Sequence, residues 1–429
     1  MKQLFKYIIV SLLSAEARIL LARKKPKIIA ITGSVGKTST KDAIFAVIKH
    51  ETHARKSEKS FNSDIGVALS VLGLPNGWQN PFAWIHIIAE GLIVALFARE
   101  YPEWLVLEVG VDRPGDMARI TAWIKPDIVV LTRLPDMPVH VEYFSSPEEV
   151  TKEKLELVSA LKEDGVLVYN NDDERVRQVA EGLRQKTVGF SRYSLSDFTA
   201  SADKVIYENG RAAGVECTLT HGGEAVLVFV HGSLGVQHAY NYAAAAAVGS
   251  LLDVPITRAA AALKGHTPPA GRMRLIDGLK DTLIIDDTYN SSPVALERSL
   301  QSLKEVKGAT RKIAVLGDML ELGQFSVLAH LAAGEQASQA TNILMTVGVR
   351  ARGIAKGALN AGMDESRIFQ YDDAARIGKE LELMLQTGDV VLIKGSQSTR
   401  LERVVEEIMA DPESASELLV RQDPMWAKL

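Results

Sequence analysis

A glycine-rich loop between an apolar run and a helix-like run constrains the fold of this chain more than any other feature. The loop is Thr32-Gly33-Ser34-Val35-Gly36-Lys37-Thr38-Ser39; it follows the apolar run 28–31 and precedes a helical pattern over 40–50. Glycine allows backbone conformations, and a close approach to a ligand, that a Cβ atom would block. The N–H groups of the loop and of the next helix then face an anion. The layout predicts a strand, a phosphate-binding loop and a helix, which together begin an α/β nucleotide-binding fold.

The lysine and the threonine of this loop stand where phosphate chemistry requires them. In such loops the lysine, here Lys37, reaches the terminal phosphates of a nucleotide, and the hydroxyl, here Thr38, ligates Mg²⁺. The strict eight-residue motif is not met, because position 31 is isoleucine. A glycine turn with a solvated lysine is the alternative, and the flanking strand and helix favour nucleotide binding. We therefore predict that residues 33–39 bind a nucleotide.

Length, charge and cysteine content limit the class of protein. A chain of 429 residues is expected to form two or three domains, since one domain has about 150 residues. The net charge of −4 gives no basic footprint, so we expect no nucleic-acid partner. The one cysteine, Cys217, lies in the alternating run 215–219, which predicts a buried strand thiol and not a nucleophile. This cysteine usage fits a reducing, cytoplasmic compartment.

The N-terminal segment is basic and amphipathic. Residues 1–27 contain seven Lys or Arg residues and one acid, Glu16. Six apolar residues share one face at helical spacing: Leu4, Phe5, Ile8, Leu12, Ala15 and Ile19. We predict a helix over 1–26, whose apolar run 7–13 is short for a membrane span.

A second apolar stretch covers residues 81–98. His86 and Glu90 interrupt it, and its length is borderline for crossing a membrane. For this stretch and for the N-terminal helix, two interpretations stay open. The helices pack on the protein, or they make peripheral contact with an anionic membrane, which basic amphipathic helices favour.

Short β-branched runs alternate with helical stretches along most of the chain. The predicted strands are 105–109, 127–132, 166–169, 313–316, 343–347 and 390–394. This alternation predicts an α/β fold with largely parallel sheets. Three runs within 200–232, separated by glycine turns, predict a small antiparallel appendage. Glycines and prolines cluster at 264–271, where we expect the boundary between a domain over 27–268 and a domain over 269–429.

Several predicted strands end in polar residues. Glu108 ends an apolar strand, and a carboxylate there can hold Mg²⁺ beside Thr38, because the carboxyl ends of parallel strands open onto the ligand crevice. The segments 286–290, 317–323 and 393–396 follow later strands in the same way and suggest a charged ligand. By themselves, His140 fits a solvated loop and Lys154 fits a solvated helix face.

Together these segments resemble the Mur ligase family, the ATP-dependent amide ligases of cell-wall peptide synthesis. The resemblance covers about residues 27–405 and is closest to the branch that adds D-Ala-D-Ala to a UDP-muramoyl tripeptide. The segments that carry it are 31–38, Phe61-Asn62-Ser63-Asp64-Ile65-Gly66-Val67, Asp286-Asp287-Thr288-Tyr289-Asn290-Ser291-Ser292-Pro293, Gly317-Asp318-Met319-Leu320-Glu321-Leu322-Gly323 and Val391-Leu392-Ile393-Lys394-Gly395-Ser396.

The resemblance implies a role for each candidate site residue. The catalytic residues are Lys37, Glu108, His140 and Lys154. The ligands of Mg²⁺, two ions in all, are Thr38, Glu108, His140 and a carbamylated Lys154. ATP is bound by Gly33, Ser34, Val35, Gly36, Lys37, Thr38, Ser39, Asn241, Arg272, Asp287 and Asn290. The substrates are bound by Asn62, Asp318, Glu321, Lys394 and Ser396. His238 departs from the family, because many members have asparagine at its position.

The resemblance also implies the architecture and the reaction. We expect a central ATPase domain with a mostly parallel sheet, and a Rossmann-like C-terminal α/β domain. The expected enzyme is a monomeric acid–amino-acid ligase that activates a carboxylate as an acyl phosphate. Members of this branch begin with a UDP-sugar-binding domain, whereas about 26 residues precede the first strand here, and 75–102 looks like an insertion. The acceptor is therefore expected to be a UDP-muramoyl peptide or a lipid-linked or polymer-linked carboxylate.

Two other classes of function remain as alternatives. A phosphate loop also occurs in kinases and nucleotide-driven switches, which make no amide. A scaffold at the membrane with an inactive ATP site is the other class, and the complete set of Lys37, Thr38, Glu108, His140 and Lys154 argues against it.

Overall fold

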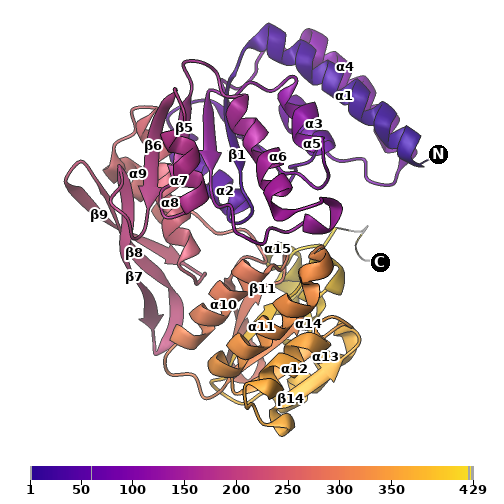
Figure 1. Cartoon of the computed structure of the whole chain (residues 1–429), viewed down its shortest axis with the longest axis vertical. Helices are drawn as coiled ribbons and strands as arrows, with labels where there is room; N and C mark the ends of the chain where they lie inside the picture. Colours follow the sequence, from indigo (N-terminus) through magenta and orange to yellow (C-terminus); the bar gives the residue numbers. More distant parts are fainter. Residues whose placement is uncertain (1, 59, 424–425, 427–429) are drawn as a thin grey trace.

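The computed structural model describes residues 2–58, 60–423 and 426. The chain forms two sheets, one of nine strands built from the first half of the sequence and one of six strands built from the second half (Figure 1). The ends of the predicted ranges 1–26 and 269–429 reach residues 1, 424–425 and 427–429, which lie outside the described residues. The expected α/β fold with mostly parallel sheets is confirmed.

The nine-stranded sheet has the order β2-β3-β1-β4-β5-β6-β7-β8-β9. Its first six strands in this order pair in parallel, and β7, β8 and β9 pair antiparallel at one edge. The predicted appendage thus continues the same sheet. The strands are β1 (Lys27–Thr32), β2 (Ala54–Lys56), β3 (Trp104–Glu108), β4 (Ile128–Leu131), β5 (Val166–Asn170), β6 (Lys186–Ser191), β7 (Phe198–Glu208), β8 (Arg211–His221) and β9 (Glu224–His231).

The six-stranded sheet has the order β10-β11-β15-β12-β13-β14. All of its pairs are parallel except β10 with β11. The strands are β10 (Arg274–Gly278), β11 (Thr282–Asp287), β12 (Lys312–Gly317), β13 (Ile343–Val347), β14 (Ile368–Tyr371) and β15 (Val390–Lys394).

Helices cover both faces of each sheet (Figure 1). In β1, Ile28 and Ala30 belong to the apolar cluster on one face, while Ile29 and Ile31 belong to the cluster on the other. A strand buried on both faces reads as a continuous apolar run, and for that reason the pattern 28–31 was recognisable. The helices of the first half are α1 (Lys2–Lys24), α2 (Lys37–Ile48), α3 (Asp64–Leu72), α4 (Pro81–Phe97), α5 (Asp116–Thr121), α6 (Pro147–Ser159), α7 (Glu174–Glu181), α8 (Gln237–Ser250) and α9 (Ile256–Lys264). Those of the second half are α10 (Pro293–Glu305), α11 (Ser326–Ala340), α12 (Arg352–Asn360), α13 (Ala374–Met384), α14 (Glu402–Ile408) and α15 (Ala415–Leu418).

The two apolar helices of the first half, α1 and α4, lie side by side at one end of the molecule (Figure 1). Ile9, Leu13, Ala17 and Leu20 of α1 are buried in the cluster that also contains α3 and α4. The predicted apolar face, by contrast, points outward: Phe5, Ile8, Leu12 and Ile19 are exposed, and the side chain of Leu4 lies outside the described residues. Within the described part of the chain, no helix combines the length and apolarity that crossing a membrane requires.

Candidate active site

The phosphate loop connects β1 to α2 at the carboxyl edge of the first sheet. Gly33 and Gly36 have φ values of 136° and 88°, which a residue with a Cβ atom rarely adopts. Because Gly36 caps the helix in the left-handed region, α2 begins at Lys37, earlier than the pattern over 40–50 indicated. The Lys37 ammonium donates a hydrogen bond to the Gly33 carbonyl at 2.9 Å. The Thr38 and Ser60 hydroxyls lie 3.1 Å apart, a contact that the sequence did not predict.

Asn241, near the start of α8, lies against the phosphate loop. Its side-chain oxygen accepts a hydrogen bond from the Thr40 hydroxyl at 3.0 Å. Its amide nitrogen is buried and has no hydrogen-bond partner among the described residues, so a donor remains for a ligand. His238, one turn earlier, is buried; the burial lowers its pKa to about 3, and its Nε2 lies 2.7 Å from the Ser233 hydroxyl. His238 is therefore a neutral residue of the interior.

Glu108 ends β3, the strand beside β1, and its partner in the sheet register is Ile31. The sheet thus brings Glu108 next to the phosphate loop, as the position of Glu108 at the end of a predicted strand indicated. One carboxylate oxygen accepts a hydrogen bond from the Asn62 side-chain amide at 3.1 Å. The other is buried and lacks a partner in the described part of the chain. A buried carboxylate oxygen without a partner is costly unless a cation binds there.

Lys154 of α6 is buried, although its charge pattern resembled a solvated face. Only 2% of the residue is exposed, and within residues 2–58, 60–423 and 426 it forms no hydrogen bond or ion pair. Burial, and after it the nearby Lys37 ammonium, lower the pKa of Lys154 to about 7. The pKa of Lys37 is also lowered, first by burial and then by Arg272 of the C-terminal half. Lys37 therefore lies close enough to both Lys154 and Arg272 for their charges to interact with its own.

His140 connects the two halves of the molecule. It precedes η1 (Val141–Tyr143) with a φ of 71°, and its Nδ1 lies 2.6 Å from a carboxylate oxygen of Glu321, which precedes η3 (Gly323–Phe325). Its Nε2 lies 3.7 Å from Asp112. The hydrogen-bonding His140 ring lowers the pKa of Glu321. A predicted metal ligand and a predicted substrate-binding residue thus meet between the two halves of the chain.

The remaining candidates follow β11, β12 and β15 of the second sheet. Buried Lys394 donates hydrogen bonds to the Asp287 carboxylate at 2.6 Å and to the Asn290 carbonyl at 2.9 Å. The Arg272 guanidinium lies over the Tyr289 ring, 4.0 Å from its centroid. These contacts gather the predicted nucleotide-binding residues of this half, and they give Lys394 an internal partner.

The predicted substrate-binding pair Asp318 and Ser396 is also brought together. The backbone N–H of Ser396 donates to the Asp318 carbonyl at 3.0 Å, and the Ser396 hydroxyl accepts from the N–H of Leu320 at 2.9 Å. The Asp318 carboxylate accepts from the N–H of Ala351 at 2.7 Å. The two loops that follow β12 and β15 are therefore locked together, next to Glu321.

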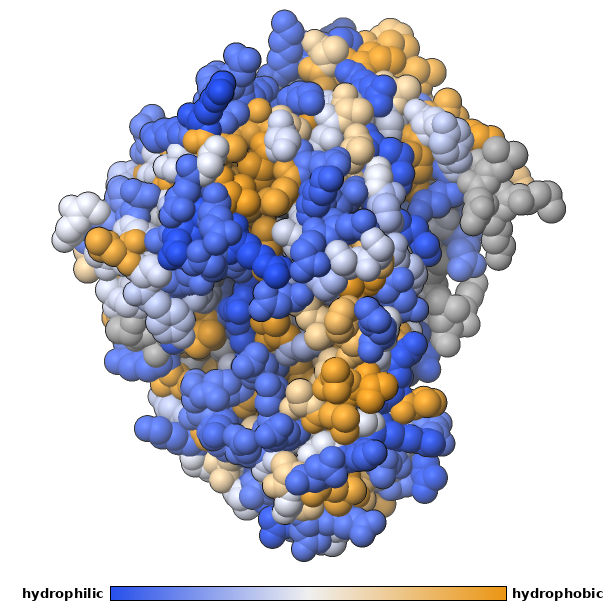
Figure 2. Space-filling model, in the orientation of Figure 1, coloured by the Kyte–Doolittle hydropathy of each residue, from blue (hydrophilic) through white to orange (hydrophobic). Residues whose placement is uncertain are grey.

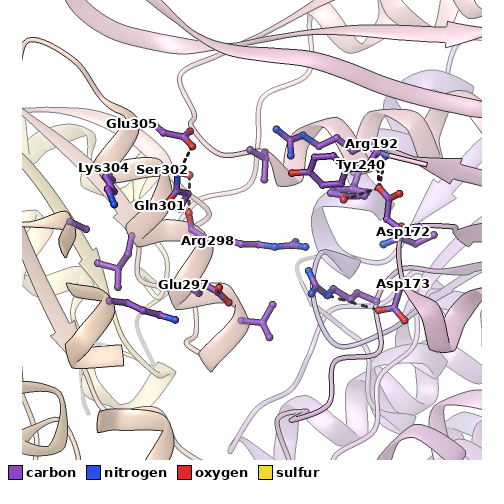
Figure 3. Close-up of a pocket in the computed structure, with 18 of the residues that line it drawn as sticks. Asp172, Asp173, Arg192, Tyr240, Glu297, Arg298, Gln301, Ser302, Lys304 and Glu305 are labelled. Atoms are coloured by element: carbon purple, nitrogen blue, oxygen red, sulfur yellow. Dashed lines mark hydrogen bonds and ion pairs between the residues drawn. The ribbon is translucent and has the colours of Figure 1, made fainter. Parts of the chain in front are cut away.

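A cavity of about 600 Å³ between the two halves contains residues that the sequence analysis missed. Figure 3 shows Asp172, Arg192 and Tyr240 on one side and Arg298 of α10 on the other. The Tyr240 hydroxyl donates to Asp172 at 2.9 Å, and burial lowers the pKa of Arg298 to about 10. Asp172 follows strand β5, so the polar strand end that drew attention to Glu108 was an available signal here as well.

The arrangement fits Mg²⁺ and ATP. Among the described side chains, no group of three His, Cys, Asp or Glu residues is placed to hold a metal ion. The predicted Mg²⁺ ligands include only two residues of these four types, Glu108 and His140, because Thr38 and a modified Lys154 would supply further oxygen ligands. The unpartnered carboxylate oxygen of Glu108 and the unpartnered amide of Asn241 are the atoms that a cation and a nucleotide would satisfy.

Comparison with known proteins matches both halves of the chain. Residues 31–249 match the Mur ligase middle domain, and residues 271–397 match the Mur ligase, glutamate ligase domain. The chain is 30% identical over 390 residues to the UDP-N-acetylmuramoyl-tripeptide--D-alanyl-D-alanine ligase of Bacillus subtilis; the match covers 90% of this chain and 76% of that protein. It is 28% identical over 386 residues to the Escherichia coli enzyme of the same name, covering 88% and 76%.

Solved structures give the same result. The MurF ligase from Thermotoga maritima in complex with ADP superposes with a TM-score of 0.75 at 26% identity, covering 95% of this chain and 84% of that one. MurF from Acinetobacter baumannii superposes with a TM-score of 0.77 at 20% identity, covering 94% and 81%, which shows a shared fold.

Proposed function

The chain belongs to the Mur ligase family, and we propose that it is an ATP-dependent ligase that joins D-Ala-D-Ala, or a similar amine, to the carboxylate of a UDP-muramoyl peptide. The observation that carries the proposal is a set of buried polar groups around the loop that lack partners among the described residues. It comprises one carboxylate oxygen of Glu108, the side-chain amide of Asn241 and the ammonium group of Lys154. If no charged ligand bound beside the phosphate loop, these buried groups would lack hydrogen-bond or charge partners, which lowers the stability of the folded chain. A site built from both halves of one chain is compatible with a monomer, and we propose that this monomer works in the cytoplasm.

The proposed reaction has two steps. One carboxylate oxygen of the acceptor forms a bond to the γ-phosphorus of ATP, and ADP leaves. The amine nitrogen then bonds the acyl carbon, phosphate leaves, and the amine loses a proton. Lys37 and the amides of residues 33–39 hold the β- and γ-phosphates, while Asn241, Arg272, Asp287 and Asn290 hold the rest of the nucleotide. Asn62, Asp318, Glu321, Lys394 and Ser396 position the substrates.

Mg²⁺ would be held by Thr38 and Glu108, and a second ion by His140 and a carbamylated Lys154. Bound there, the metal supplies positive charge that offsets the approach of two anions. Carbamate formation needs a neutral amine, and burial together with the Lys37 charge lowers the pKa of Lys154 to about 7, which favours the neutral form. Its lack of an ion pair with other described residues supports the same modification.

Chemical rescue tests the carbamate. We expect Lys154→Ala to lose turnover and to recover part of it when a small carboxylic acid such as acetate is added, because the acid replaces the missing oxygen ligands. Lys152→Ala, an exposed neighbour on the same helix, should retain turnover without acid. If no small carboxylic acid restores turnover to Lys154→Ala, the result would contradict the carbamate on Lys154.

We also propose that the domains 27–268 and 269–429 close over ATP about the segment 264–271, with 75–102 as an insertion in the first. Arg272 already influences the pKa of Lys37 across this boundary. The His140–Glu321 contact lies at the same interface and supports such closure.

A phosphate-release assay tests the function. Phosphate should appear only when ATP, the UDP-muramoyl tripeptide and D-Ala-D-Ala are all present, and other carboxylate acceptors and single amino acids complete the screen. Lys37→Ala should abolish release with an unchanged unfolding midpoint, whereas exposed Lys49→Ala should not affect it. Stable transfer of the phosphoryl group to a substrate, with no amide, would identify a kinase instead.

A further inference from the structure

Two neighbouring helices carry a patch of exposed apolar side chains that the proposed reaction does not use. The α1–α4 patch consists of Phe5, Ile8, Leu12, Ile19, Phe82, Ile85, Leu92, Ile93, Leu96 and Phe97. Phe82 is 79% exposed and Phe97 is 71% exposed. Figure 2 shows apolar side chains gathered at the end of the molecule where Figure 1 places α1 and α4. Large apolar patches on a protein surface mark sites of interaction.

The exposed stripes of the two helices form one surface. Lys24 donates to the Arg99 carbonyl at 2.6 Å, Arg23 donates to the Ala95 carbonyl, and the Glu16 carboxylate lies against Gly91. Because the residue numbers on both helices rise together, the helices run parallel and side by side. Their inner faces share one apolar cluster with α3, so their outer faces point away from the protein together.

The charges around this patch are mostly basic. On α1, Lys6, Arg18 and Arg23 are exposed, whereas Glu16, the only acid of residues 1–27, is buried against α4. On α4, the exposed Glu90 carboxylate lies 3.8 Å from the His86 ring at the edge of the stripe. Because the only acid of α1 is buried, the exposed charged side chains described on this helix are all basic.

We propose that the α1–α4 patch binds the surface of an anionic lipid bilayer. The apolar side chains enter the boundary between headgroups and acyl chains, and the basic residues of α1 contact the lipid phosphates. Neither helix crosses the bilayer, in keeping with the absence of a spanning helix from the described residues. Pairing of two copies through this patch is disfavoured, because it would bring two basic α1 surfaces together. The inference goes beyond the proposed ligase activity and does not depend on it.

Vesicle co-sedimentation of the full chain tests the proposal. The chain should bind vesicles of phosphatidylcholine with about one third phosphatidylglycerol at least about tenfold more tightly than vesicles of phosphatidylcholine alone, and high salt should weaken the binding. Phe82→Ser/Phe97→Ser should lower the partition by at least about tenfold. Lys6→Glu/Arg18→Glu should lower it only on the anionic vesicles.

The matched control is Leu195→Ser/Leu383→Ser, which removes two leucines that are 96% and 81% exposed elsewhere. This variant should bind vesicles like the parent, and all variants should keep the parent's unfolding midpoint, because every substituted residue is on the surface. Equal binding by the two serine variants, or equal binding to both lipid compositions, would overturn the proposal. So would a dimer in sedimentation equilibrium that Phe82→Ser/Phe97→Ser converts to a monomer without any vesicle binding.

Discussion

The backbone conformation of the phosphate loop requires glycine at position 33, and the effect of replacing it on the free energy of unfolding can be measured without an activity assay. Gly33→Ala should lower the free energy of unfolding by about 3 kcal/mol, because the new Cβ meets the Thr132 hydroxyl and the φ of 136° is strained. Gly210→Ala is the matched control: its φ is 82° and a Cβ there meets no atom within 4 Å, so strain alone costs about 1–2 kcal/mol. Urea unfolding compares the two, and equal losses would show that the contact with Thr132 is unimportant.

Buried Lys154 should make stability depend on pH. Its folded pKa of about 7 lies below the usual 10.5, so between these values the unfolded chain binds more protons. Stability of the unmodified chain should therefore rise with pH through this window, by up to about 1.4 kcal/mol per pH unit. Urea unfolding in CO₂-free buffer at several pH values measures the slope. Lys154→Met should flatten it and Lys152→Met should not; a slope unchanged in Lys154→Met would contradict the burial of a neutral amine.

At the scale of elements, the contact between α1 and α4 contains an acid. Burial raises the pKa of Glu16 from 4.5 to about 7, so the folded chain binds more protons in this interval and stability falls as pH rises through it. Glu16→Gln should add about 1–2 kcal/mol to the free energy of unfolding at pH above 7 and nothing below pH 4. The exposed Glu90→Gln is the control. A pH-independent difference for Glu16→Gln would point to packing and not to ionisation.

Most elements could be predicted because their residues are buried on known faces. The strands 343–347 and 390–394 coincide with β13 and β15, since each is an apolar run buried on both sides. In α1 the periodicity identified one apolar face, whereas the helix has two. The face with Leu13 and Leu20 is buried and the face with Leu12 and Ile19 is exposed. Periodicity alone does not tell which apolar face meets the core.

At the scale of the whole molecule, the candidate site depends on contacts between distant segments. The positions of Glu108 and Asp287 at the ends of strands could be predicted from the sequence, because parallel sheets place such residues at one edge. The pairing of His140 with Glu321 arises from the packing of the two halves, whereas Lys154 is buried where α6 packs against α5 and β1. No local pattern contains that information; the charges around Lys154 indicated a solvated helix.

The central claim is that the chain activates a carboxylate by attaching the γ-phosphoryl group of ATP to one of its oxygens. The direct test is a reaction with an acceptor whose carboxylate carries ¹⁸O, followed by mass spectrometry of the released phosphate. The account predicts one ¹⁸O atom in each phosphate for every amide formed, in the presence of the amine. Phosphate free of ¹⁸O, or a phosphoryl group that stays on the substrate, would contradict it.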